Sequence, residues 1–137
     1  MAGSARLADA GFLVALLDRD DRHHRWAAEA ARRHPPPWAT CDAVLSEVFY
    51  LLGRDGTRQC ADLVRRGGVV LSFGLAAQID TVLALMDKYA DVPMSLADAC
   101  LVRMTEVLPD PVVLSTDSDF RVYRRHGRQI VPSVLPD

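Results

Sequence analysis

Four apolar stretches of this chain each contain one acidic residue, which is the first or only charged residue of its stretch. These acidic residues are Asp9, Glu47, Asp98 and Asp117. Carboxylates are rarely placed within core-forming segments unless another group compensates their charge. Two carboxylates about 4 Å apart repel by roughly 4 kcal/mol at an effective dielectric constant near 20, so a cluster of them needs protons or a cation. Because all-oxygen ligand sets suit hard divalent ions, we expect one shared site for Mg²⁺ or Mn²⁺.

Strands that alternate with helices are expected to position these acids. The sequence predicts strands near residues 6–9, 38–41, 69–73, 112–116 and 129–133, and helices near 11–18, 22–33, 42–52, 56–66, 75–90, 96–107 and 118–126. This order predicts an α/β fold with a mostly parallel sheet covered on both faces. Ligands of such sheets bind at the carboxyl ends of the strands. Asp9 and Asp117 end the first and fourth strands, so they meet there if those strands are neighbours, and Glu47 and Asp98 can point into the same crevice.

Each acid also has a structural alternative. Asp9 and Asp117 lie at predicted helix starts and can be N-caps, and Ser95 with Asp98 matches a capping box. Glu47 falls in the middle of a predicted helix, where no cap is needed. Its alternative is a side chain that reaches solvent from the helix edge.

A second group of charges follows Asp117. Asp119 is either a fifth metal ligand or a favourable charge in the first turn of the last predicted helix. Arg121, Arg124 and Arg125 belong to the densest basic patch of the chain. They are candidates for binding a phosphate backbone, and the alternative is that they complement the dipole at a helix C-terminus.

Length and composition set the broad class. The chain has 137 residues, which suits a single domain over residues 1–137, and half of them are hydrophobic, which excludes a disordered chain. The net charge of −2 gives no overall attraction to nucleic acid. Cys41, Cys60 and Cys100 form no Cys-x-x-Cys pair and no zinc spacing. With no apolar run long enough to span a bilayer and no signal peptide, the sequence indicates a cytoplasmic protein.

The order and spacing of the acidic segments resemble those of PIN-domain nucleases, and more narrowly the VapC-type toxin ribonucleases of bacterial toxin–antitoxin pairs. The matching segments are residues 9–24, 40–47, 95–99 and 115–120. They run from near the first residue to the last predicted helix, so the resemblance covers nearly the whole chain. On this resemblance Asp9, Glu47, Asp98 and Asp117 are the metal-binding acids, and Asp119 is a further candidate.

The resemblance implies more than the ligand set. It implies a three-layer α/β/α sandwich with a five-stranded parallel sheet, a homodimer, and a small antitoxin encoded beside the toxin. Many relatives carry Ser or Thr shortly after the first Asp, where this chain has Ala10 and Gly11. Ser115 or Thr116 can supply the hydroxyl in their place.

The leading hypothesis is therefore an endoribonuclease that uses Mg²⁺ or Mn²⁺ and leaves a 5′-phosphate. One alternative is a PIN-like scaffold that binds without cleaving, and another is a nuclease of RNA processing that is not a toxin. Transfer through an aspartyl phosphate is a further alternative. It is disfavoured for two reasons. Enzymes of the haloacid-dehalogenase type need a second Asp two residues after the first, where this chain has Gly11, and receiver domains need a Lys near the end of a late strand, whereas Lys88 lies in a predicted helix.

Overall fold

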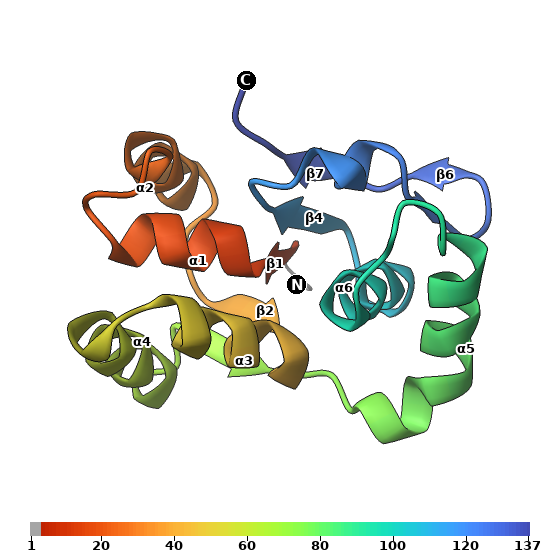
Figure 1. The fold of residues 1–137 in the computed structure, drawn as a ribbon, viewed down its shortest axis with the longest axis horizontal. Helices are drawn as coiled ribbons and strands as arrows, with labels where there is room; N and C mark the ends of the chain where they lie inside the picture. Colours follow the sequence, from red (N-terminus) through yellow and green to blue (C-terminus); the bar gives the residue numbers. More distant parts are fainter. Residues whose placement is uncertain (1–3) are drawn as a thin grey trace.

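Five parallel strands form a central sheet with helices on both faces (Figure 1). The computed structural model describes residues 4–137. The strands are β1 (Ala5–Ala8), β2 (Trp38–Thr40), β3 (Val69–Leu71), β4 (Pro111–Leu114) and β7 (Ser133–Val134), in the order β3-β2-β1-β4-β7. The predicted α/β class and the five-stranded parallel sheet are confirmed.

The helices divide into two layers (Figure 1). One layer holds α1 (Ala10–Leu17), α2 (His24–Arg33), α3 (Asp42–Leu51) and α4 (Arg54–Arg65), and the other holds α5 (Leu75–Lys88) and α6 (Leu96–Val107). The chain adds β2 and β3 on one side of β1 and then returns through α5 and α6 to place β4 on the other side. The strand order therefore reverses between β1 and β4, and ligand crevices of open α/β sheets lie at such a reversal.

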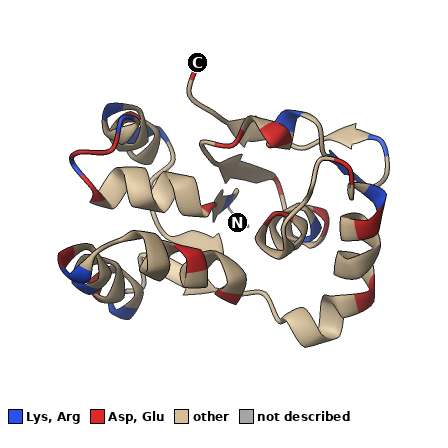
Figure 2. Ribbon diagram, in the orientation of Figure 1, with Lys and Arg blue, Asp and Glu red and all other residues tan. Residues whose placement is uncertain are grey.

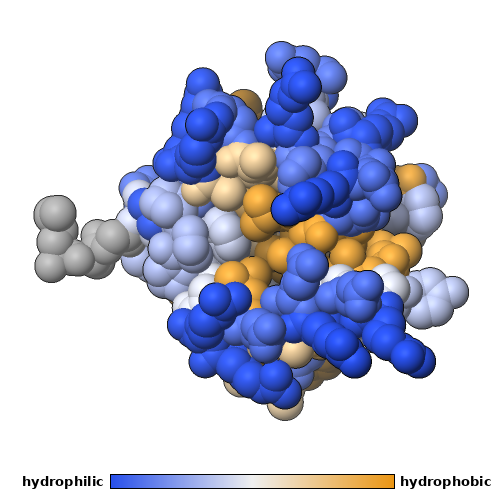
Figure 3. Space-filling model, turned by 90° about the vertical axis from the view of Figure 1, so that its left-hand side faces the viewer, coloured by the Kyte–Doolittle hydropathy of each residue, from blue (hydrophilic) through white to orange (hydrophobic). Residues whose placement is uncertain are grey.

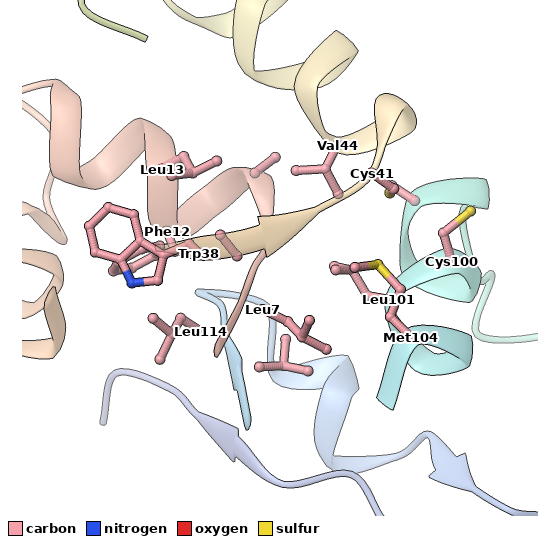
Figure 4. Packing of buried hydrophobic residues seen from close by; sticks show 14 of the residues in the cluster. Leu7, Phe12, Leu13, Trp38, Cys41, Val44, Cys100, Leu101, Met104 and Leu114 are labelled. Atoms are coloured by element: carbon pink, nitrogen blue, oxygen red, sulfur yellow. The ribbon is translucent and has the colours of Figure 1, made fainter. Parts of the chain in front are cut away.

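Buried apolar side chains on both faces hold the central strands in place (Figure 4). Leu7 of β1 and Leu114 of β4 are fully buried. Phe12 of α1 packs edge-on against Trp38, with ring centroids 5.2 Å apart, and Leu101 and Met104 of α6 also belong to this buried core. Because the strands are fixed by this packing, the residues that follow β1 and β4 are held at defined positions.

The segment after β4 differs from its prediction. The helix expected over residues 118–126 is wrong beyond a short 3-10 helix, η1 (Ser118–Arg121), and the strand expected over 129–133 is split. Its first part, β6 (Gln129–Ile130), pairs antiparallel with β5 (Arg124–Arg125), and only β7 joins the sheet. The Arg124 guanidinium donates to the carbonyls of residues 121, 122 and 123, which a continuing helix would need for its own N–H groups. Positive φ angles of 51° at His126 and 81° at Gly127 then turn the chain back.

Two further observations concern the environment of the chain. No helix within residues 4–137 has the length and apolar character needed to cross a membrane. Cys41, Cys60 and Cys100 are free thiols, and all three are buried.

Candidate active site

Asp9 lies where β1 ends and α1 begins, with its side chain almost completely buried. Its backbone N–H continues the pairing of β1 with β4 by donating to the Leu114 carbonyl at 3.0 Å. Its Oδ1 accepts from the Ala10 N–H at 2.8 Å, and its Oδ2 accepts from the Ser115 hydroxyl at 2.6 Å. The carboxylate is thus held between the first turn of α1 and the end of β4.

Asp98 lies in the first turn of α6 and forms the predicted capping box with Ser95. The Ser95 Oγ accepts from the Asp98 N–H at 3.0 Å, and the Asp98 Oδ2 accepts from the Ser95 N–H at 3.4 Å. The same Oδ2 accepts from the Tyr123 hydroxyl at 2.9 Å. Within residues 4–137 no group donates to the other oxygen of Asp98, Oδ1.

Asp117 and Asp119 follow β4. The Asp117 N–H donates to the Ser115 Oγ at 2.9 Å, so Ser115 connects the backbone of Asp117 to the side chain of Asp9. The Asp117 Oδ1 accepts from the Asp119 N–H at 2.9 Å and caps η1. Asp117 and Asp119 are both partly exposed, unlike Asp9.

Glu47 comes from α3 and is solvent-exposed. Its carboxylate makes no hydrogen bond and no ion pair with residues 4–137. Figure 2 shows acidic segments on α3 and α6 and at the start of α1 around the centre of the view. Glu47 therefore brings a free carboxylate toward this region from the helix layer opposite α6.

The helix-capping roles considered for the aspartates are confirmed, and they do not prevent the same side chains from binding a metal ion. Asp9 and Asp117 are N-caps, and Asp98 belongs to a capping box. A carboxylate has about four acceptor positions on its two oxygens, and each cap uses only some of them. The backbone donors thus orient the aspartates and leave oxygen lone pairs available.

The pKa values of Asp9, Asp98 and Glu47 are raised by burial and by the charges of other acids of the set. Burial raises the pKa of Asp9 to about 7, against the opposing hydrogen bonds from Ser115 and Ala10, and the charges of Asp98 and Glu47 raise it further. Burial also raises the pKa of Asp98, to which the charge of Asp117 adds. Partial removal from water raises the pKa of Glu47, with additional effects from Asp98 and Asp117. The charges of the predicted acids thus act on one another in pairs, and their sharing of one site stays a prediction.

The acids fit a hard divalent cation but are not arranged as a preformed ligand set. Within residues 4–137, no three His, Cys, Asp or Glu side chains are placed closely enough to hold a metal ion. All the candidate ligand atoms are carboxylate oxygens whose charges repel. Asp98 and Asp117 each keep one oxygen that accepts no hydrogen bond from residues 4–137. Mg²⁺ and Mn²⁺ prefer such oxygen ligands and relieve the repulsion between them. Metal binding and the ligand roles remain predictions.

The three arginines expected to contact RNA lie in different environments. Arg121, at the end of η1, is exposed. Arg124 donates to three carbonyls of its own segment, and Arg125 donates to the Thr105 carbonyl of α6. Among these three side chains, Arg121 is therefore the one that projects freely into solvent.

Thr116 occupies the space beside Gly11. A Cβ added at Gly11 would overlap with the Thr116 Oγ1 and would lie 3.2 Å from its Cβ. The absence of a side chain at Gly11 therefore lets Thr116 approach the first turn of α1. Ser115 supplies the hydroxyl that bonds to Asp9, as the sequence allowed.

Tyr123 is the residue of this site that the sequence did not reveal. Its side chain is fully buried and donates to Asp98 from 25 positions further along the chain. In the sequence it is one aromatic among several, and no spacing connects it to Asp98. Only the fold of the segment after η1 brings the two side chains together.

Comparison with known proteins agrees with this architecture. The family model for the PIN domain matches residues 6–125. The crystal structure of VapC20 from Mycobacterium tuberculosis, described as a toxin that cleaves the sarcin-ricin loop, superposes with a TM-score of 0.70. The two chains are 22% identical, and the match covers 86% of this chain and 94% of VapC20. No curated protein sequence matches the chain. The extent of the family match, together with the parallel sheet and the acids at the ends of β1 and β4, shows that this chain belongs to the PIN domain family.

Proposed function

We propose that this protein is a metal-dependent endoribonuclease and acts in the cytoplasm as the toxin of a toxin–antitoxin pair. The observation that carries the proposal is that β1 and β4 are neighbours with Asp9 and Asp117 following them, linked through Ser115 at the reversal of strand order, while the charges of Asp98 and Glu47 act on Asp9. The fold shared with VapC20, a toxin that cleaves the sarcin-ricin loop, supports a nuclease activity here.

We propose Mg²⁺ or Mn²⁺ as the cofactor. When bound, such an ion lowers the pKa of a water molecule and neutralises charge that develops on the scissile phosphate. Asp9, Asp98 and Asp117 hold the ion directly or through water, with Asp119 as a further ligand. Glu47 completes the negative charge of the site or orients the attacking water from the opposite helix layer.

RNA binding and the chemistry at the phosphate complete the proposed reaction. Arg121, Arg124 and Arg125 contribute positive charge to the segment that follows Asp119, and the exposed Arg121 binds the phosphate backbone. In-line attack by water on the phosphate leaves a 5′-phosphate and a 3′-hydroxyl. This path requires neither a catalytic histidine nor a 2′-hydroxyl nucleophile.

Cleavage of end-labelled RNAs, including transfer RNA and ribosomal RNA fragments, tests the proposal. Wild-type protein should cut with Mg²⁺ or Mn²⁺, stop in EDTA and yield 5′-phosphate ends. Asp98→Asn should not cut, and Asp80→Asn, which changes an exposed acid of α5, should cut like the wild type. Cyclic phosphate ends, or full activity of Asp98→Asn, would contradict the site assignment.

A surface hollow supports the proposal of an antitoxin partner. It has a volume of about 790 Å³, and its apolar lining comes from Leu16 and Leu17 of α1 and from Leu51 and Leu52 at the end of α3. Charged and polar residues, including Arg19, Arg54 and Asp55, line the rest of it. Figure 3 shows an apolar band on this face between two hydrophilic regions. An amphipathic helix can bury its apolar side in such a groove. We propose that a helix of the antitoxin binds here.

Replacement of exposed Leu51 by Asp tests this surface. The exchange should weaken binding of the co-expressed antitoxin and leave RNA cleavage by the isolated toxin unchanged, because the hollow does not include the four acids. Asp62→Asn, on the exposed part of α4, is the matched control. Equal antitoxin affinity in Leu51→Asp and wild type would exclude this groove.

We also propose that the protein forms a homodimer. Ile79 and Leu83 of α5 are exposed and lie one helical turn apart on the same side of the helix, a pattern that suits contact with another helix. Sedimentation equilibrium should give the mass of a dimer for the wild type and a lower mass for Leu83→Glu. A wild-type monomer at micromolar concentration would contradict the dimer.

A further inference from the structure

The hydrogen bonds of Asp98 are concentrated on one of its two oxygens. The Tyr123 hydroxyl and the Ser95 N–H both donate to Oδ2, at 2.9 and 3.4 Å. No described residue donates to Oδ1. Two donors on one oxygen fix the rotation of a carboxylate about its Cβ–Cγ bond and leave the second oxygen available.

The stronger of these two contacts comes from a side chain that cannot easily turn away. Tyr123 is fully buried, and its ring packs edge-on against Tyr89 and Phe120 with centroids 5.2 and 5.3 Å away. The Tyr89 hydroxyl accepts from the Arg124 N–H at 2.9 Å and so fixes the backbone next to Tyr123. Aromatic packing and this backbone contact together hold the Tyr123 hydroxyl at Asp98.

Tyr123 also lies on the segment that supplies Asp117. The two residues flank η1, whose first turn is capped by Asp117. Docking of this segment against α6 therefore sets the position of Asp117 and the orientation of Asp98 at the same time. The buried Tyr123 hydroxyl needs an acceptor, and the acceptor that the fold supplies is a carboxylate of the proposed site.

We propose that Tyr123 is a positioning residue for the cation site, because its hydroxyl holds the Asp98 Oδ2 and thereby directs Oδ1 toward the divalent ion. The inference rests on the proposed function, since it needs a cation at the acids. Partners that orient a metal ligand typically change metal affinity by about 10- to 100-fold when they are removed. Tyr123 thus acts through Asp98 and does not itself contact the ion or the RNA.

Calorimetric titration with Mn²⁺ tests the inference without relying on activity. Tyr123→Phe removes only the hydroxyl and should bind Mn²⁺ about 10- to 100-fold more weakly than the wild type. Tyr50→Phe is the control, because it removes the hydroxyl of an exposed tyrosine that does not belong to the aromatic cluster around Tyr123. Its Mn²⁺ affinity should equal that of the wild type.

Cleavage and a double variant separate positioning from a general loss of structure. In Tyr123→Phe the Mn²⁺ concentration for half-maximal cleavage should rise, and excess Mn²⁺ should recover most of the maximal rate. In the Asp98→Asn background, Tyr123→Phe should cause no further loss of Mn²⁺ binding, because its effect runs through the Asp98 carboxylate. A further independent loss would overturn the inference.

The outcomes distinguish this inference from the proposed function. Wild-type affinity in Tyr123→Phe, with metal-dependent cleavage intact in the wild type, would overturn the role of Tyr123 alone. No Mn²⁺ binding by the wild type would overturn both. If Tyr123→Phe does not fold, the ultraviolet difference spectra of wild type and Tyr50→Phe on addition of Mg²⁺ decide, since metal binding at Asp98 should perturb the buried Tyr123 equally in both. An unchanged spectrum would overturn the inference.

Discussion

The hydroxyl of Ser115 donates to the Asp9 Oδ2 at 2.6 Å and joins the end of β4 to the end of β1. The same oxygen of Ser115 accepts from the Asp117 N–H at 2.9 Å. A single fully buried hydroxyl therefore fixes the relative positions of two of the four acids. This contact holds the proposed site together where the two central strands end.

Ser115→Ala should destabilise the protein at pH 8, because it leaves a buried carboxylate oxygen of Asp9 without its donor. Hydrogen bonds to charged groups contribute about 2 kcal/mol, so the free energy of unfolding should fall by about that amount. Urea unfolding followed by circular dichroism measures the change. Ser118→Ala, at an exposed position three residues later, should stay within about 0.5 kcal/mol of the wild type. Equal losses in the two variants would remove the special role of Ser115.

The placement of Asp9 and Asp117 at the same edge of the sheet could be predicted from the sequence because it follows from strand order. Parallel strands expose their carboxyl ends on one edge, and a residue that follows a buried strand lies at that edge. The assignment of residues 1–137 to a single domain rests on chain length and stays a prediction. Glu47 was also recognisable, since a lone charge in the middle of an apolar helix has no capping role.

The structure of the segment after η1 could not be predicted from the sequence, and the reason is physical. Its basic residues and aromatics suit a helix, but the Arg124 guanidinium takes the carbonyls that a helix would use. The Tyr123 hydroxyl is bound by Asp98, which is distant in the sequence. A local side-chain contact of Arg124 and the distant contact of Tyr123 together decided this segment, and helix propensity carries no information about either.

Asp9→Asn should change the pH dependence of stability in EDTA. Burial raises the pKa of Asp9 from 3.8 to about 7 in the folded protein, so between these values the folded state binds more protons than the unfolded state. This contribution to stability is fully present below pH 3.8 and is lost as the pH rises through about 7, by an amount on the order of several kcal/mol. Asp9→Asn should therefore lose less stability than the wild type between pH 5 and pH 8.

Urea unfolding at intervals of pH measures this difference. Asp80→Asn, at an exposed position of α5, should keep the wild-type profile. Parallel profiles for Asp9→Asn and wild type would show that Asp9 titrates equally in the folded and unfolded states. The raised pKa would then be wrong.

Divalent cations should stabilise the folded protein through the carboxylates. Free Mn²⁺ at about 100 times its dissociation constant should raise the free energy of unfolding by about 2.7 kcal/mol, because the unfolded chain does not hold the acids together. Thermal unfolding with Mn²⁺ and with EDTA measures the shift. Glu47→Gln should reduce it, and Glu29→Gln, which lies on α2 and pairs with Arg33, should retain it. A full shift in Glu47→Gln would place Glu47 outside the site.

Gly11→Ala should destabilise the protein because the new methyl group overlaps with Thr116. Overpacking of this kind costs about 1–3 kcal/mol. Thr116→Ala removes the overlapping hydroxyl, so the double variant should be more stable than the sum of the two single changes indicates. Gly53→Ala is the control for replacement of a glycine, since a Cβ there meets no atom within 4 Å. Additive effects at positions 11 and 116 would contradict the close approach of the two residues.

Arg121 and Arg124 should have different effects although they are three residues apart. Arg121 is exposed and free to bind phosphate, so Arg121→Ala should weaken RNA binding for all sequences and reduce the salt dependence of affinity by about one unit of slope. Arg124 holds three carbonyls, so Arg124→Ala should mainly lower the free energy of unfolding, by about 1 kcal/mol.

Fluorescence anisotropy with labelled RNA in the inactive Asp98→Asn background, at several salt concentrations, separates the effects of Arg121→Ala and Arg124→Ala. Arg65→Ala, on α4, should change neither the affinity nor the slope, because its side chain lies on an exposed helix and pairs with Asp62. Loss of affinity in Arg124→Ala without loss of stability would assign Arg124 to the RNA rather than to the fold.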